Sequence, residues 1–202
     1  MPLTPVVRNI LMINVLIFLI MMMGGSGIFA ARLAAYYPES PYFRPYQLVT
    51  HMFMHGNVAH IFFNMYALAI LGPPLEERLG SQRFFIFYFL SGLGAIGLFF
   101  LVKYIELHVY HAPVPINVPV LGASGAVFGI LAGFGTLYPT VRLMLLFPPV
   151  AMQAKYFVML YAGLELYLGL QGLQPGVAHF AHVGGALFGF LLLKFWGVRP
   201  VR

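Results

Sequence analysis

The chain has 202 residues, of which 61% are hydrophobic and 8% are charged. Ordinary soluble domains carry roughly 25% charged residues, so this composition indicates a membrane protein. Cysteine is absent, which excludes disulfides, thiolate catalysis and cysteine-ligated metals. The net charge of +6 does not indicate nucleic-acid binding, because the basic residues are scattered between apolar runs and form no patch.

Apolar runs bounded by charges, prolines and glycines predict a polytopic all-α bundle of six transmembrane helices. No second domain fits beside them, so we expect a single domain over residues 1–202. The expected spans are about Asn9 to Phe29, Asn57 to Leu75, Phe84 to Val102, Ser124 to Tyr138, Lys155 to Leu170 and His179 to Trp196.

The first apolar segment has a second interpretation, because Arg8, a short apolar stretch and the letters AARLAA are also the layout of a cleaved signal peptide. We favour its retention. With six helices both termini share one side, and the basic residues then separate cleanly between the two faces. One side receives Arg8, Arg78, Arg83, Arg142, Lys155, Lys194, Arg199 and Arg202, and the other receives Arg32, Arg44 and Lys103. The positive-inside rule makes the first side cytoplasmic.

In this topology, the expected second, fourth and sixth helices all begin at the external side. Their first turns carry His60 and Asn64, then Ser124, then His182. Polar side chains inside a membrane are costly and tend to mark a functional interior. We therefore expect these four side chains to meet just below the outer surface.

Glycines at intervals of four residues suggest how two of these helices pack. Gly125, Gly129 and Gly133 form one small-residue stripe, and Gly185 and Gly189 form another. Such stripes permit close backbone approach between membrane helices. Because each stripe lies next to a polar residue, packing the two stripes would bring Ser124 and His182 together.

A serine beside a histidine is sufficient for acyl transfer, with the imidazole as general base and then general acid. The start of the Ser124 helix offers free backbone N–H groups to a developing oxyanion. His60 and Asn64 share a helical face and could add donors, although they could also merely bond nearby loops. Aspartate is absent and Glu165 alone among the glutamates is expected in the outer half of the membrane, so we expect a Ser–His dyad without a carboxylate.

Two competing motifs are weaker. The hydrolase elbow G-x-S-x-G fails because Ala126 occupies its last position and no strand precedes it. His51 and His55 have the spacing of a zinc pair, but Met52 stands where the H-E-x-x-H motif requires glutamate. We expect no metal and no cofactor, and a histidine metal site remains the less favoured alternative.

Four motifs together resemble the rhomboid intramembrane serine proteases, in their six-helix bacterial form. They are HGNVAHIFFN, GPPLEERLG, LGASG and AHVGGALFG, in the family's order along most of the chain. The resemblance implies Ser124 as nucleophile, His182 as base, and His60, Asn64 and the Ser124 backbone N–H as the oxyanion hole. It also implies that Gly122 belongs to the turn that presents the serine and that Glu76 is structural.

The sequence departs from the family pattern at two places. Tyr46-Gln47 replaces a common Trp-Arg pair before the second helix, and Phe128 replaces a common tyrosine, although its ring could still stack on His182. Neither change removes a catalytic atom.

These features predict an endopeptidase in the bacterial inner membrane that cuts transmembrane segments of other proteins near the external face. A non-proteolytic rhomboid-like protein that binds or escorts membrane segments is the alternative from another class. A transporter with a histidine proton relay is a third. The sequence predicts neither the substrate nor the oligomeric state.

Overall fold

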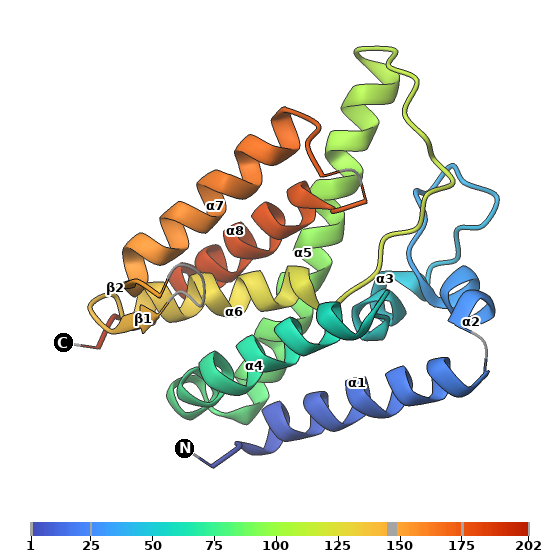
Figure 1. The fold of residues 1–202 in the computed structure, drawn as a ribbon. Helices are drawn as coiled ribbons and strands as arrows, with labels where there is room; N and C mark the ends of the chain where they lie inside the picture. The colour runs from blue at the N-terminus through green and yellow to red at the C-terminus, as the bar shows by residue number, and fades with distance from the viewer. Residues whose placement is uncertain (1, 25, 145–148, 175, 202) are drawn as a thin grey trace.

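The computed structural model describes all residues except 1, 25, 145–148, 175 and 202, and helices dominate it (Figure 1). Short elements lie in the connections, namely a 3₁₀ turn, His51–Phe53, and an antiparallel hairpin of β1 and β2. In chain order the elements are α1 (Pro5–Gly24), α2 (Ser26–Leu33), α3 (Gln47–Thr50), α4 (Val58–Leu79), α5 (Ser81–His108), α6 (Ser124–Leu137), β1 (Arg142–Met144), β2 (Ala151–Gln153), α7 (Ala154–Leu170) and α8 (His179–Phe195).

The predicted all-α membrane bundle is confirmed, and each expected span has its helix in α1, α4, α5, α6, α7 or α8. Three of these helices, α1, α4 and α5, are long and apolar enough to cross a membrane, and α6 and α8 are shorter apolar helices. The largest single difference is at the end of α5, which reaches His108 instead of Val102. Helix α1 begins at Pro5 instead of Asn9 because proline suits the first helical position. It ends at Gly24, and a separate short helix α2 follows.

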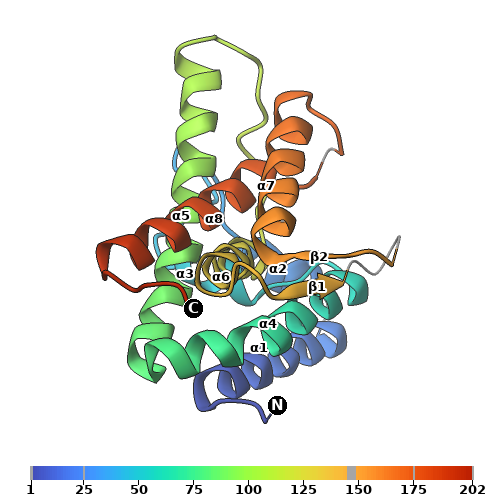
Figure 2. The ribbon, with the colours of Figure 1, turned by 90° about the vertical axis from the view of Figure 1, so that its left-hand side faces the viewer.

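Helix α6 lies at the centre of the bundle. Seen nearly end-on in Figure 2, it is surrounded by α4, α5, α7 and α8, and most of its residues are buried. Its 14 residues span only about 21 Å at about 1.5 Å per residue, which is less than the roughly 30 Å hydrocarbon core. A central helix of this length begins or ends inside the membrane, so a residue at its first position can lie below the surface.

Backbone contact between α6 and α8 follows from their glycines. A Cβ atom added at Gly185 would overlap the carbonyl oxygen of Gly125, and one added at Gly189 would lie 2.6 Å from the carbonyl oxygen of Gly129. The small-residue stripes therefore pack against each other, as the sequence predicted. Gly133 is different, because its neighbours are Leu75 of α4 and Phe87 of α5.

Two connections at the α6 start pack against each other. Ala35 and Val120 form an isolated antiparallel bridge with hydrogen bonds of 2.8 Å in both directions. The hydroxyl of Ser40 donates to the side-chain oxygen of Asn117 at 2.8 Å. The extended chain before α6 is thus held by the long connection between α1 and α4.

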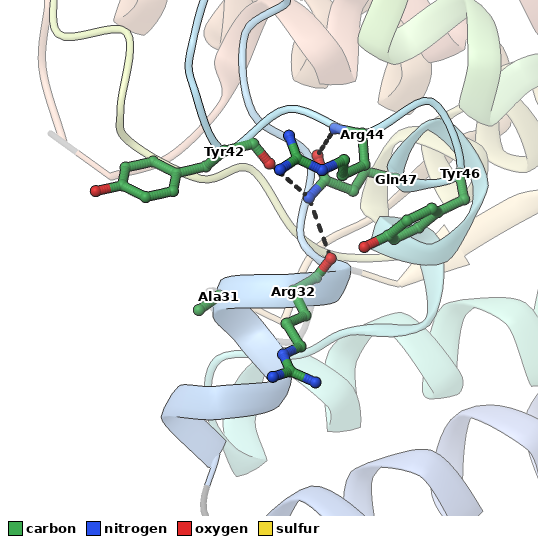
Figure 3. A pocket seen from close by; sticks show the side chains of 6 residues that line it. All are labelled: Ala31, Arg32, Tyr42, Arg44, Tyr46 and Gln47. Carbon is green, nitrogen blue, oxygen red and sulfur yellow. Dashed lines mark hydrogen bonds between the residues drawn. The ribbon is translucent and has the colours of Figure 1, made fainter.

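Gln47 anchors that long connection from within (Figure 3). Its side-chain oxygen accepts from the Arg44 amide at 2.9 Å, and its side-chain nitrogen donates to the carbonyls of Arg32 and Tyr42, each at 3.1 Å. The Arg44 guanidinium donates to the carbonyls of Pro41 and Phe43. Gln47, one of the two residues that depart from the family pattern here, therefore provides anchoring hydrogen bonds within this loop.

Glu76 joins helices at the opposite end of the bundle. It accepts from the amides of Val6 and Val7 at 3.0 and 2.9 Å, and from the hydroxyls of Thr4 and Ser81 at 2.5 and 2.6 Å. The first amides of a helix have no partner inside it, and a carboxylate from elsewhere satisfies them. Glu76 thus ties the starts of α1 and α5 to α4, which supports its structural interpretation.

Candidate active site

A glycine turn presents Ser124 at the first position of α6. Gly122 has a φ of +129°, a conformation that side chains rarely adopt, and its amide donates to the His51 carbonyl at 2.9 Å. The His51 ring is buried, which lowers its pKa to about 4, so it is neutral and its Nδ1 donates to the Gln47 carbonyl at 2.8 Å. The backbone and the ring of His51 therefore link the turn to the loop before α4.

Ser124 and His182 are in direct contact. The distance from the His182 Nε2 atom to the Ser124 hydroxyl oxygen is 2.8 Å, although 58 positions separate the two residues. Phe128, one turn beyond the serine, stacks on the His182 ring with centroids 4.4 Å apart and planes 4° from parallel. The structure thus brings together a hydroxyl, an imidazole and an aromatic face that restrains the imidazole.

His60 faces the same turn from α4. A Cβ atom added at Gly122 would lie 2.7 Å from His60 Nε2 and 3.5 Å from the Ser124 hydroxyl oxygen, so both polar atoms surround the glycine. Glycine is needed here for this close approach as well as for its φ. The His60 ring also packs edge-on against buried His55, with centroids 5.1 Å apart.

Asn64 is buried one turn further along α4. Its side-chain nitrogen donates to the His60 carbonyl at 2.9 Å, and this uses one of its two N–H groups. Asn57 caps the start of α4, because its side chain accepts from the His60 amide at 2.8 Å. His60 therefore lies beside Gly122, and Asn64 is one turn further along the same helix.

The α6 start also supplies backbone donors. The first intrahelical bond runs from the Val127 amide to the Ala123 carbonyl at 3.0 Å. The amides of Ser124, Gly125 and Ala126 precede that bond and have no acceptor within the helix. They point with the positive end of the helix dipole toward the region before Ser124.

One expectation is wrong, namely that no carboxylate lies behind His182. Oε2 of Glu165, on α7, is 2.9 Å from His182 Nδ1 and 2.7 Å from His179 Nδ1. The sequence placed Glu165 in the outer half of the membrane but could not assign the rotation of its helix. The spacing of His179 and His182, three apart at a helix start, was the signal that one carboxylate could reach both.

Glu165, His179 and His182 could in principle hold a metal ion, since their donor atoms lie within 4.8 Å of one another. The two N···O distances of 2.7 and 2.9 Å are hydrogen-bond distances. Ligand atoms on a tetrahedral zinc ion with bonds of about 2.0–2.1 Å are about 3.3 Å apart. The observed distances therefore fit hydrogen bonds between Glu165 and the two histidines better than three ligands of a metal ion.

The chain is similar in sequence to known proteins over most of its length. The family model described as Rhomboid domain matches residues 42–198, which include all the residues discussed above at the site. RHOMBOID-like protein 4 of Arabidopsis thaliana is 32% identical over 155 residues, covering 77% of this chain and 35% of that protein.

Two bacterial relatives carry the word protease in their names. Rhomboid protease AarA of Providencia stuartii is 33% identical over 148 residues, covering 70% of this chain and 52% of that protein. Rhomboid protease GlpG of Serratia proteamaculans is 28% identical over 206 aligned residues, covering 96% of this chain and 63% of that protein. The chain spans less than two thirds of the length of each of these relatives.

Proposed function

The chain belongs to the rhomboid family, and from that premise we propose that it is an intramembrane serine endopeptidase with Ser124 as nucleophile and His182 as general base. The observation that carries the proposal is the 2.8 Å contact between the Ser124 hydroxyl and His182 Nε2. A general base must lie within hydrogen-bond reach of the proton it removes, and this pair does.

In the proposed reaction, His182 Nε2 takes the hydroxyl proton as Ser124 Oγ attacks the scissile carbonyl. The tetrahedral intermediate then collapses, and the imidazolium gives its proton to the leaving amine. Water deprotonated by the same imidazole hydrolyses the acyl-enzyme. Each step needs one hydroxyl, one imidazole and donors for the oxyanion.

The oxyanion donors in this proposal are the Ser124 amide, the free N–H of Asn64 and the His60 ring. The Ser124 amide precedes the intrahelical bonds of α6. The His60 ring lies beside Gly122, and Asn64 is one turn further along α4. Donors fixed before the reaction stabilise charge as it develops and need no reorganisation.

The proposed substrates are transmembrane segments of other proteins, cut near the external face. A membrane helix shields its own carbonyls, so a segment must unwind locally before attack. The short length of α6 supports a site below the surface that water reaches from one side. Most basic residues are expected on the face away from the α6 start. The positive-inside rule makes that face cytoplasmic, which supports a site near the external face.

Purified protein incubated in detergent with a panel of single-span membrane proteins tests this function. We expect cuts inside or beside the membrane segment, identified by mass spectrometry, together with fluorophosphonate labelling mapped to Ser124. Ser124→Ala should abolish both. Ser81→Ala is the matched control, because Ser81 also begins a helix but lies at the other end of the bundle.

Two outcomes would contradict the proposal. Label on another serine, unaffected by Ser124→Ala, would remove the nucleophile. Stable binding of uncut segments across the whole panel, with no label on Ser124, would instead favour the non-proteolytic alternative.

A further inference from the structure

Glu165 reaches from α7 to the first turn of α8, and Figure 1 shows these two helices side by side. Its Oε2 atom faces Nδ1 of His179 and Nδ1 of His182 at hydrogen-bond distance. The three side chains are 13%, 5% and 12% exposed, in that order. Hydrogen bonds between a carboxylate and imidazole groups are strong at sites from which water is largely excluded.

The position of Glu165 determines which nitrogen of His182 carries the proton. An ionised carboxylate only accepts hydrogen bonds, so His182 Nδ1 must be the donor to Glu165. In the neutral ring the other nitrogen, Nε2, then has a free lone pair facing the Ser124 hydroxyl. This is the tautomer that a base acting on Ser124 requires.

The stacked ring of Phe128 cannot make that selection. Stacking restrains the plane of the imidazole, with 4° between the two planes. A half-turn of the imidazole about its Cβ–Cγ bond leaves that plane unchanged but moves both nitrogens to other positions. The terminal torsion of histidine is broad and roughly two-fold. A hydrogen bond at Nδ1 removes this ambiguity.

His179 holds the carboxylate in place. Its Nδ1 faces Glu165 at 2.7 Å, and its Nε2 faces the carbonyl oxygen of Leu173 at 3.1 Å. Both of those oxygens are acceptors, so a protonated His179 would satisfy both contacts at once. The ring is buried and bonded to the loop after α7, which gives Glu165 a fixed partner in addition to His182.

We infer that Glu165 is a positioning residue, held by His179, that keeps His182 in the orientation and tautomer needed to take the proton of Ser124. The inference rests on the proposed function for its catalytic consequence. The site would then work with three linked residues, although only Ser124 and His182 touch the reacting atoms.

The test compares Glu165→Leu, Glu165→Gln and wild type, each shown to be folded by thermal unfolding. Leucine removes the acceptor, and glutamine keeps the side-chain shape but presents an NH₂ donor as well as an oxygen to Nδ1. We expect kcat to fall clearly in Glu165→Leu, with little change in KM. In Glu165→Gln the fall can reach about 10⁴-fold, as when the orienting carboxylate of a triad is replaced by its amide, because the NH₂ group favours the wrong tautomer. Glu77→Gln, an exposed glutamate of α4, is the matched control.

A second readout does not depend on turnover. Ring ¹⁵N NMR spectra, with the His182 signals assigned by their loss in His182→Ala, should show the Nδ1–H tautomer in wild type and a mixture in Glu165→Leu. A purely structural role for Glu165 would lower stability without changing this ratio.

The outcomes separate the two proposals. Wild-type kcat in folded Glu165→Leu, or an unchanged Nδ1–H signal in that variant, would overturn the positioning role. If wild type cuts no substrate and Ser124 takes no label, the proposed function fails, and the NMR comparison still decides whether Glu165 sets the tautomer.

Discussion

Asn64 shows how one side chain can divide its hydrogen-bonding capacity between the fold and the proposed reaction. One N–H of its amide bonds the His60 carbonyl, four residues earlier on α4. This bond fixes the side chain along the helix and leaves a second N–H for another acceptor. Such a residue is oriented before any substrate arrives, which is what an oxyanion donor needs.

We predict that Asn64→Ala lowers turnover much more than substrate affinity. Loss of one oxyanion donor costs about 2.7–4 kcal/mol in well-studied hydrolases, equivalent to roughly 10²–10³ in kcat. Steady-state kinetics on one cleaved substrate would measure kcat and KM separately. Asn9→Ala, at an exposed position of α1, is the control. Full turnover in folded Asn64→Ala would show that its proposed role is wrong.

The residues that could be predicted from the sequence are those whose partners lie on recognisable faces. Ser124 and His182 each stand beside a glycine stripe, so the register of two helices indicates that they meet. Glu165 has no such marker. Helix α7 carries apolar residues around its whole circumference, so nothing in the sequence shows which side faces α8.

At the scale of elements, the crossing of α6 and α8 sets the distance between serine and histidine. Gly185 lies one turn beyond His182, and its Cα is against the Gly125 backbone next to Ser124. No side chain separates the two helices at this point. The catalytic geometry proposed here therefore depends on backbone contact, which side-chain motion cannot loosen.

We predict that Gly185→Ala destabilises the protein by roughly 1–3 kcal/mol, the usual cost of overpacking, and slows fluorophosphonate labelling of Ser124. The added methyl group must push the helices apart. Thermal unfolding in detergent and the labelling rate measure the two effects. Gly163→Ala on α7 is the matched control, because a Cβ there meets nothing within 4 Å. Equal behaviour of the two variants would contradict the close-contact account.

The expected spans match the helices because long apolar runs and their flanking charges define membrane segments directly. Helix ends and short elements were harder to predict. Glu76 accepts from the Val6 amide at the start of α1, although the two residues are 70 positions apart. A helix start that depends on so distant a partner has no local sequence signal. The hairpin of β1 and β2 has only three residues per strand, which is too short for an alternating pattern to be recognised.

At the scale of the whole molecule, the distribution of basic residues predicts the orientation in the membrane. The α6 start and the stretch His111 to Val120 would face outward, and both termini would lie in the cytoplasm. The family supports an integral membrane protein, and the orientation stays a prediction of the charge pattern.

The cysteine-free chain allows a direct test with single cysteines at two positions of nearly equal exposure. Val118 is 47% exposed and Val201 is 45% exposed. In intact cells an impermeant thiol reagent should label Val118→Cys, and it should label Val201→Cys only after the membrane is opened. The reverse pattern would invert the orientation and place the site at the cytoplasmic face.

The weak burial of α7 has a mechanical consequence. Every residue of α7 is described, and among them Ala154, at its first position, is the one buried residue. The rest of the helix is only partly covered, and toward its other end Gly169 lies close against His179 and Phe180 of α8. Movement of that end away from α8 would break these contacts. Among the contacts broken would be those of Glu165 with the α8 histidines. Because His182 is bonded to Glu165, any change that moved α7 away from α8 would also release the imidazole, so the position of this lightly buried helix determines whether His182 is aligned.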